Sequence, residues 1–150
     1  MARAIGGVVV GYLVMFVFVF ASFSIAYLAL GANLAFQPGS YHVSMLWIAV
    51  MVVLNFVAAF LGGLVCSLIA KNPRASMSLA AVVLVLGLVM AIPVLTGAIG
   101  EPPATRDASV GNLEAMQHAR QPAWSSVASP LIGVVGVLIG GRRQRKGAPA

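Results

Sequence analysis

The stretch that decides the fold is the basic turn Lys71-Asn72-Pro73-Arg74, together with the apolar run on either side of it. Residues 43–70 precede the turn and residues 77–99 follow it, and neither run contains a charged side chain. An apolar run of roughly 18 or more residues is long enough to cross a bilayer as a helix. Because Lys and Arg concentrate on the cytoplasmic side, the stretch predicts two membrane-spanning helices joined by a cytoplasmic turn.

Two more apolar runs complete the set, at about residues 4–30 and 122–141. The fourth run contains Pro130, but a span that began there would keep only about 12 residues, or about 18 Å, so we expect Pro130 to lie inside a full span. The chain is 61% hydrophobic and 8% charged, against about 25% charged in soluble domains. The sequence therefore predicts an all-α integral membrane protein: residues 1–150 form one domain, a four-transmembrane-helix bundle.

The basic residues also predict the orientation. With four spans, Arg3, the central turn and the tail at residues 142–150 fall on one side, and residues 31–42 contain no Lys or Arg. We therefore expect both termini in the cytoplasm and residues 100–121 as an outer loop. No Asn begins an Asn-x-Ser/Thr glycosylation signal in this short chain. These features favour the bacterial plasma (inner) membrane.

The net charge of +6 has two interpretations. In a soluble protein it would suggest nucleic acid, but here the basic side chains stand at the ends of apolar runs. They are therefore expected to set topology and to contact anionic lipid head groups of the bilayer, with no nucleic-acid partner. The residues concerned are Lys71, Arg74, Arg142, Arg143, Arg145 and Lys146.

Small residues recur at the four-residue spacing that lets membrane helices approach closely. The predicted packing positions are Gly7, Gly11, Ala59, Gly62, Gly63, Gly133, Gly136 and Gly140. The spans contain no acidic or basic residue, no catalytic motif is present, and a single cysteine, Cys66, cannot form a redox pair. The first functional hypothesis is therefore a non-enzymatic accessory or assembly module without a cofactor, which packs through its Gly and Ala faces as a homo-oligomer or against another membrane protein.

A second hypothesis rests on polar residues within the spans. They are Asn55, near the bilayer centre, and Ser22, Thr96, Ser126 and Ser129 in the outer half. These side chains are candidates for a polar pocket, which would suit a small carrier or channel for a neutral or apolar solute. The alternative is that Asn55 makes an interhelical hydrogen bond and that the hydroxyls bond to their own helices. The sequence leaves both open.

The outer side carries three further features. His42, His118 and Glu114 are candidates for a divalent-metal site in an outer-face sensor, a weaker hypothesis, although such residues are more often solvated loop side chains. Tyr27, Trp47 and Trp124 are expected in the outer aromatic belt. A surface helix is expected from Asp107 or Ser109 to Arg120.

Overall fold

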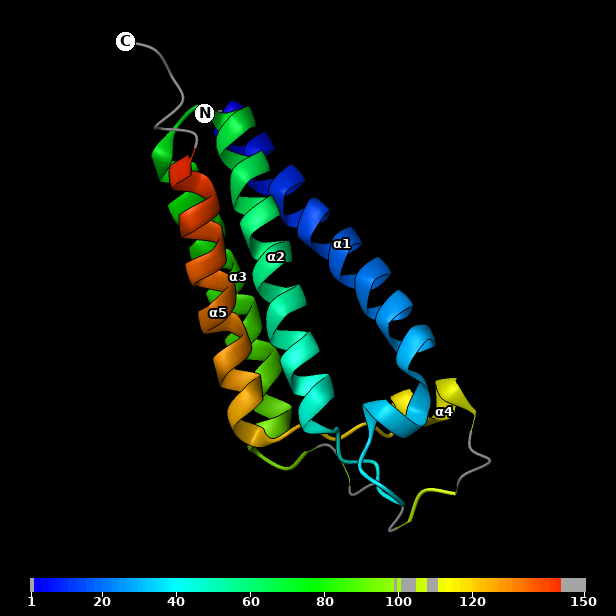
Figure 1. Ribbon diagram of the computed structural model, residues 1–150. Coiled ribbons are helices and arrows are strands. Elements are labelled where there is room, and N and C mark those ends of the chain that lie inside the picture. Colours follow the sequence, from blue (N-terminus) through cyan, green and yellow to red (C-terminus); the bar gives the residue numbers. More distant parts are fainter. Residues whose placement is uncertain (1, 99, 101–104, 108–110, 144–150) are drawn as a thin grey trace.

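The computed structural model describes residues 2–98, 100, 105–107 and 111–143 (Figure 1). These residues form five helices: α1 (Ala2–Ala35), α2 (Met45–Ala70), α3 (Pro73–Leu95), α4 (Asn112–Gln117) and α5 (Ala123–Arg143). Four of them are long and apolar enough to cross a membrane, namely Ala2–Ala35, Met45–Ala70, Arg74–Leu95 and Ala123–Arg142. The prediction of an all-helical chain with four helices able to span a membrane is confirmed.

The α2–α3 connection is as short as its sequence suggests. Lys71 ends α2 in the left-handed conformation (φ 49°), and its backbone N–H donates to the carbonyl of Ser67. Asn72 then caps α3, because its Oδ1 accepts from the backbone N–H of Arg74 at 3.0 Å. Pro73 at the first helical position needs no helical hydrogen-bond partner. This early cap makes α3 start at Pro73 rather than 77, and it ends at Leu95 rather than 99.

The long helices form a bundle that is closed at one end (Figure 1). Helix α1 packs along α2, α2 along α5, and α5 along α3. We call the end where α1 begins, α5 ends and α2 connects to α3 the basic end. The opposite end, with the α1–α2 connection and α4, is the loop end. Toward the loop end α1 leans away from α3 and α5, and among the described residues no Cα atom of α1 is recorded within 8 Å of one of α5.

Glycines bring α1 against α2 near the basic end. A methyl group added at Gly7 would lie 2.8 Å from the carbonyl oxygen of Cys66, and one added at Gly11 would lie 2.8 Å from that of Gly62. Both distances are shorter than van der Waals contact, so only glycine permits this approach. Leu79 of α3 reaches the same place, with Cδ2 at 3.0 Å from that added methyl at Gly11.

A second set of small residues brings α2 against α5. A methyl group added at Gly63 would lie 2.7 Å from the Cα of Val137, and one added at Gly136 would lie 2.7 Å from the Cβ of Ala59. At Gly140 it would meet the main chain of Phe60. The two faces of α2 that carry small residues are therefore covered by helices of the same chain.

The loop end is held by aromatic packing and by a buried arginine. Trp47 is buried, with its ring centroid 5.9 Å from that of Phe23 and 5.7 Å from that of Tyr27. Arg106 is also buried; its guanidinium lies 5.6 Å from the ring centroid of Phe36 and its Nε donates to a backbone carbonyl. Tyr27 and Trp47, expected in the outer aromatic belt, thus pack inside this cluster at the loop end, and their depth in a membrane stays a prediction.

Two elements near the loop end differ from their predicted extent. The outer-loop helix is limited to Asn112–Gln117, and Ala115 buries it against the aromatic cluster. Helix α1 runs on past residue 30 to Ala35, but Gly31 interrupts it with φ 67° and ψ 171°, a conformation that favours glycine. The segment of α1 after Gly31 can therefore take a direction of its own.

Candidate functional site

The leaning of α1 leaves a cavity between the four long helices, on the loop-end side of the glycine contacts. Its volume is about 640 Å³, within the range of small-molecule sites in proteins, about 300–1,000 Å³. Its lining residues come from all four long helices, from the α1–α2 connection and from the segment before α5: Met15, Val19, His42, Asn55, Ala58, Val83, Gly87, Met90, Ala91, Val94, Ala119, Arg120, Gln121, Ala123, Ser126, Ser129, Pro130 and Gly133.

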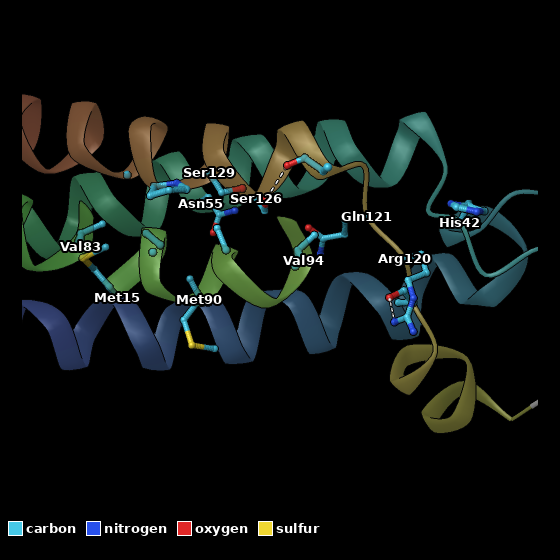
Figure 2. A pocket seen from close by; sticks show the side chains of 18 residues that line it. Met15, His42, Asn55, Val83, Met90, Val94, Arg120, Gln121, Ser126 and Ser129 are labelled. Atoms are coloured by element: carbon cyan, nitrogen blue, oxygen red, sulfur yellow. Dashed lines mark hydrogen bonds between the residues drawn. The ribbon is translucent and has the colours of Figure 1, made fainter. Parts of the chain in front are cut away.

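One wall of the cavity is polar and belongs to α2 and α5. Figure 2 shows Asn55 of α2 beside Ser126 and Ser129 of α5, with Gln121 nearer the loop end. Asn55 is ten residues into α2, so it lies about 15 Å along the helix from Met45. Among the described residues, neither the Asn55 amide nor the Ser129 hydroxyl has a hydrogen-bond partner. The cavity therefore presents unpaired polar groups within the bundle of the four long apolar helices.

Pro130 shapes this wall. Proline has no backbone N–H, so the carbonyl of Ser126, four residues earlier, loses its helical partner. The proline ring is accommodated by Gly87 of α3, where an added methyl group would lie 2.5 Å from the Cβ of Pro130. Helix α5 continues through Pro130 to Arg143, as the length argument predicts. A free carbonyl thus joins the amide of Asn55 and the hydroxyl of Ser129.

The opposite wall is apolar and belongs to α1 and α3. Met15 and Val19 lie one turn apart on α1, and Met90 and Val94 lie one turn apart on α3. Met90 is 75% exposed, so the wall is open at this point. Methionine side chains are flexible and adapt to irregular ligands. The two walls make the cavity polar on one side and apolar on the other.

Both ends of the cavity are restricted. Toward the basic end the glycine contacts around Gly11 close the bundle, and Val83 and Gly133 meet across α3 and α5. At the loop end residues 119–123, which we call the strap, run from α4 to α5 past the cavity (Figure 2). The strap is pinned because the N–H of Val43 donates to the Arg120 carbonyl at 3.0 Å, and the Arg120 N–H donates to the Tyr41 carbonyl at 2.9 Å.

The structure brings together three of the five residues predicted for a polar pocket: Asn55, Ser126 and Ser129. Ser22 and Thr96 are not among the residues that line the cavity. The Ser22 hydroxyl donates to the Phe18 carbonyl at 2.6 Å, and that of Thr96 to the Ile92 carbonyl at 2.9 Å. The hydroxyl of Ser126 also bonds within its helix, to the Ala123 carbonyl at 2.6 Å, although the residue lines the cavity. The backbonding alternative thus describes these three hydroxyls, but not that of Ser129.

The metal candidates are not assembled into a site. Within the described residues no group of three His, Cys, Asp or Glu side chains could hold a metal ion. His118 packs edge-on against Tyr41, with ring centroids 5.3 Å apart, whereas His42 lines the cavity and Glu114 is exposed on α4. Glu114 and His118 stay one helical turn apart, because the His118 N–H donates to the Glu114 carbonyl at 3.2 Å, whereas His42 belongs to the α1–α2 connection.

Three of the six basic residues predicted to contact lipid head groups can be placed, and they lie together. Lys71, Arg74 and Arg142 are exposed at the basic end. The side chain of Arg143 and residues Arg145 and Lys146 lie outside the described part of the chain.

Several cavity residues were missed by sequence reasoning. Met15, Val19 and Val94 are apolar side chains within apolar spans, so the sequence does not distinguish them from lipid-facing neighbours. Gln121 directly precedes Pro122, where the fourth predicted span begins. A polar side chain at the end of a span was the one sequence feature that could have indicated it.

Comparison of the chain with protein-family models, with curated proteins and with solved structures gives no match.

Proposed function

We propose that this chain binds a mainly apolar molecule at membrane depth, as a small carrier or binding protein for a neutral or apolar solute. The observation that supports it best is the unpaired amide of Asn55 and the unpaired hydroxyl of Ser129, both facing an apolar cavity of about 640 Å³. Unpaired polar groups in a nonpolar environment are costly. A ligand that offers a hydrogen-bonding group to them removes that cost.

Binding and carriage suit the cavity better than an open channel does. The bundle narrows to close glycine contacts at the basic end, so transfer across the membrane requires those contacts to separate. The cavity is lined by amide, hydroxyl and carbonyl groups without an acidic side chain, and its basic groups belong to His42 and Arg120 near the strap. This arrangement favours a solute that is neutral at membrane depth, and it gives no reason to propose catalysis.

The assembly hypothesis is the second candidate. Its glycines contact helices of the same chain, so a partner would have to use another surface. The same cavity offers one, because a helix of a partner could occupy the gap between α1 and α3. A partner helix and a small molecule are thus competing occupants of one site.

Native mass spectrometry in mild detergent separates the two occupants. We expect the wild-type chain to retain a small molecule and Ser129→Phe, which fills the cavity, to lose it. Ser24→Phe is the matched control, because Ser24 faces outward from α1 and its hydroxyl only bonds the Phe20 carbonyl. A bare wild-type chain, or a stoichiometric protein partner that Ser129→Phe releases, would contradict the proposed function.

We also propose that both termini face the cytoplasm of a bacterial cell, with the chain in the inner membrane. The exposed Lys71, Arg74 and Arg142 gather at the basic end, which supports this orientation and suits contact with anionic head groups. In intact cells, a membrane-impermeant maleimide is expected to label Thr105→Cys at the loop end but not Ala2→Cys at the basic end. The wild type is the control, since Cys66 is fully buried. Labelling of Ala2→Cys alone would reverse the orientation.

A further inference from the structure

The cavity has one side that none of the described helices and connections covers. Its polar wall is formed by α2 and α5, its basic end is closed by glycine contacts, and its loop end is crossed by the pinned strap. The remaining side lies between α1 and α3. These two helices meet near the basic end, where Leu79 approaches Gly11, and α1 then leans away toward the loop end (Figure 1).

The edges of this gap suit hydrocarbon rather than water. Met15 and Val19 on α1 and Met90 and Val94 on α3 line the cavity at the gap, and none of them carries a polar hydrogen-bonding group. The exposed neighbours Phe16 and Leu86 extend the apolar edges outward. A water-borne solute would have to cross this rim without any hydrogen bond, which is unfavourable.

The polar groups lie on the far side of the cavity from the gap. Asn55 and Ser129 belong to the α2–α5 wall, so a molecule that enters between α1 and α3 meets them with its leading edge (Figure 2). Its trailing edge stays against the methionine and valine side chains. Such a molecule is apolar along one edge and carries hydrogen-bonding groups along the other.

We infer that the ligand enters and leaves sideways from the bilayer, through the gap between α1 and α3. It is a neutral molecule that dissolves in the hydrocarbon core and carries hydrogen-bonding groups along one edge. The inference rests on the proposed function, because it names the source and class of the ligand for the same cavity.

The test measures access to the cavity without any ligand, so it can fail while ligand binding stands. Ser129→Cys carries a nitroxide spin label in a reconstituted bilayer, and its collisions with oxygen, concentrated in lipid, and with a nickel chelate, confined to water, are compared. Phe20→Cys on the exposed face of α1 is the lipid reference, and Thr105→Cys is the water reference. The wild-type chain shows whether buried Cys66 takes up label.

We expect the label at Ser129→Cys to match the lipid reference, with frequent oxygen collisions and few nickel collisions. Nickel collisions close to those of the water reference would show a cavity filled from the loop end and would overturn the inference. Collision rates with both reagents far below both references would show that the gap is closed, which would also overturn it.

Discussion

Replacing Gly63 by alanine is expected to destabilise the bundle, and replacing it by leucine is expected to prevent its formation. The added methyl group would lie 2.7 Å from the Cα of Val137 and would meet the carbonyl of the same residue. Both atoms belong to the main chain of α5, so the helices must separate to accommodate it. Overpacking of this kind costs typically about 1–3 kcal/mol for one methyl group. Thermal unfolding in detergent, followed by far-ultraviolet circular dichroism, measures the loss.

Gly6→Ala is the matched control, because it makes the same change in the interior of another long helix. No atom lies within 4 Å of a methyl group added at Gly6. Alanine is the better helix former by about 1 kcal/mol, so this variant is expected to be as stable as the wild type or more stable. The loss in Gly63→Ala should not depend on protein concentration, since the contact lies within one chain. Equal unfolding temperatures for the two variants would contradict the helix contact that the structure places at Gly63.

Asn55→Leu is expected to stabilise the ligand-free chain and to weaken ligand binding. The amide of Asn55 has no hydrogen-bond partner among the described residues, so leucine removes an unpaired polar group from a nonpolar cavity. Such a group costs about 1–3 kcal/mol. A ligand that bonds to the amide loses a similar amount in the variant, which corresponds to roughly a 10- to 100-fold lower affinity. Unfolding temperature and the retained mass of the ligand are the two readouts.

The two readouts separate a ligand contact from a structural one. If Asn55 instead made an interhelical hydrogen bond, Asn55→Leu would lower stability by about 0.6–2 kcal/mol. Val53→Leu, on the exposed face of the same helix, controls for the added side chain. Lower stability of Asn55→Leu relative to this control would contradict the account.

The general architecture was accessible from the sequence because it depends on run length and charge. Residues 43–70 and 77–99 are long enough to span, and the turn at Lys71-Asn72-Pro73-Arg74 separates them; the structure shows helices close to these limits. The observed helix ends differ from the predicted ones by a few residues, because capping residues determine where a helix starts. Asn72 starts α3 at Pro73, and Ser44 caps α2 at Met45.

The candidate site was accessible only in part. Asn55 stands out in an apolar run, and Pro130 marks a freed carbonyl, so Ser129 and Ser126 were reasonable candidates. The sequence could not show which hydroxyls bond to their own helices, and Ser22 does so. Nor could it show that α1 leans away from α3, because this depends on which helix pairs have glycine contacts.

Small residues illustrate the same limit. The spacing of Gly62 and Gly63 predicts close helix contacts, but it does not say whether the partner is the same chain or another. In the structure Gly62 faces Gly11 of α1 and Gly63 faces Val137 of α5. Because these glycines pack within one chain, the proposed function rests on the cavity and not on the glycine faces.

The most direct test of the central claim is a map of where an apolar ligand is held. The probe is a neutral long-chain alcohol with a diazirine on its chain, photolysed in membranes that contain the wild type or Ser129→Phe. We predict adducts on Met15, Val19 and Val94 in the wild type, and their loss in the variant. Adducts spread equally over lipid-facing side chains such as Phe20 and Leu28, and unchanged in Ser129→Phe, would contradict a ligand site in the cavity.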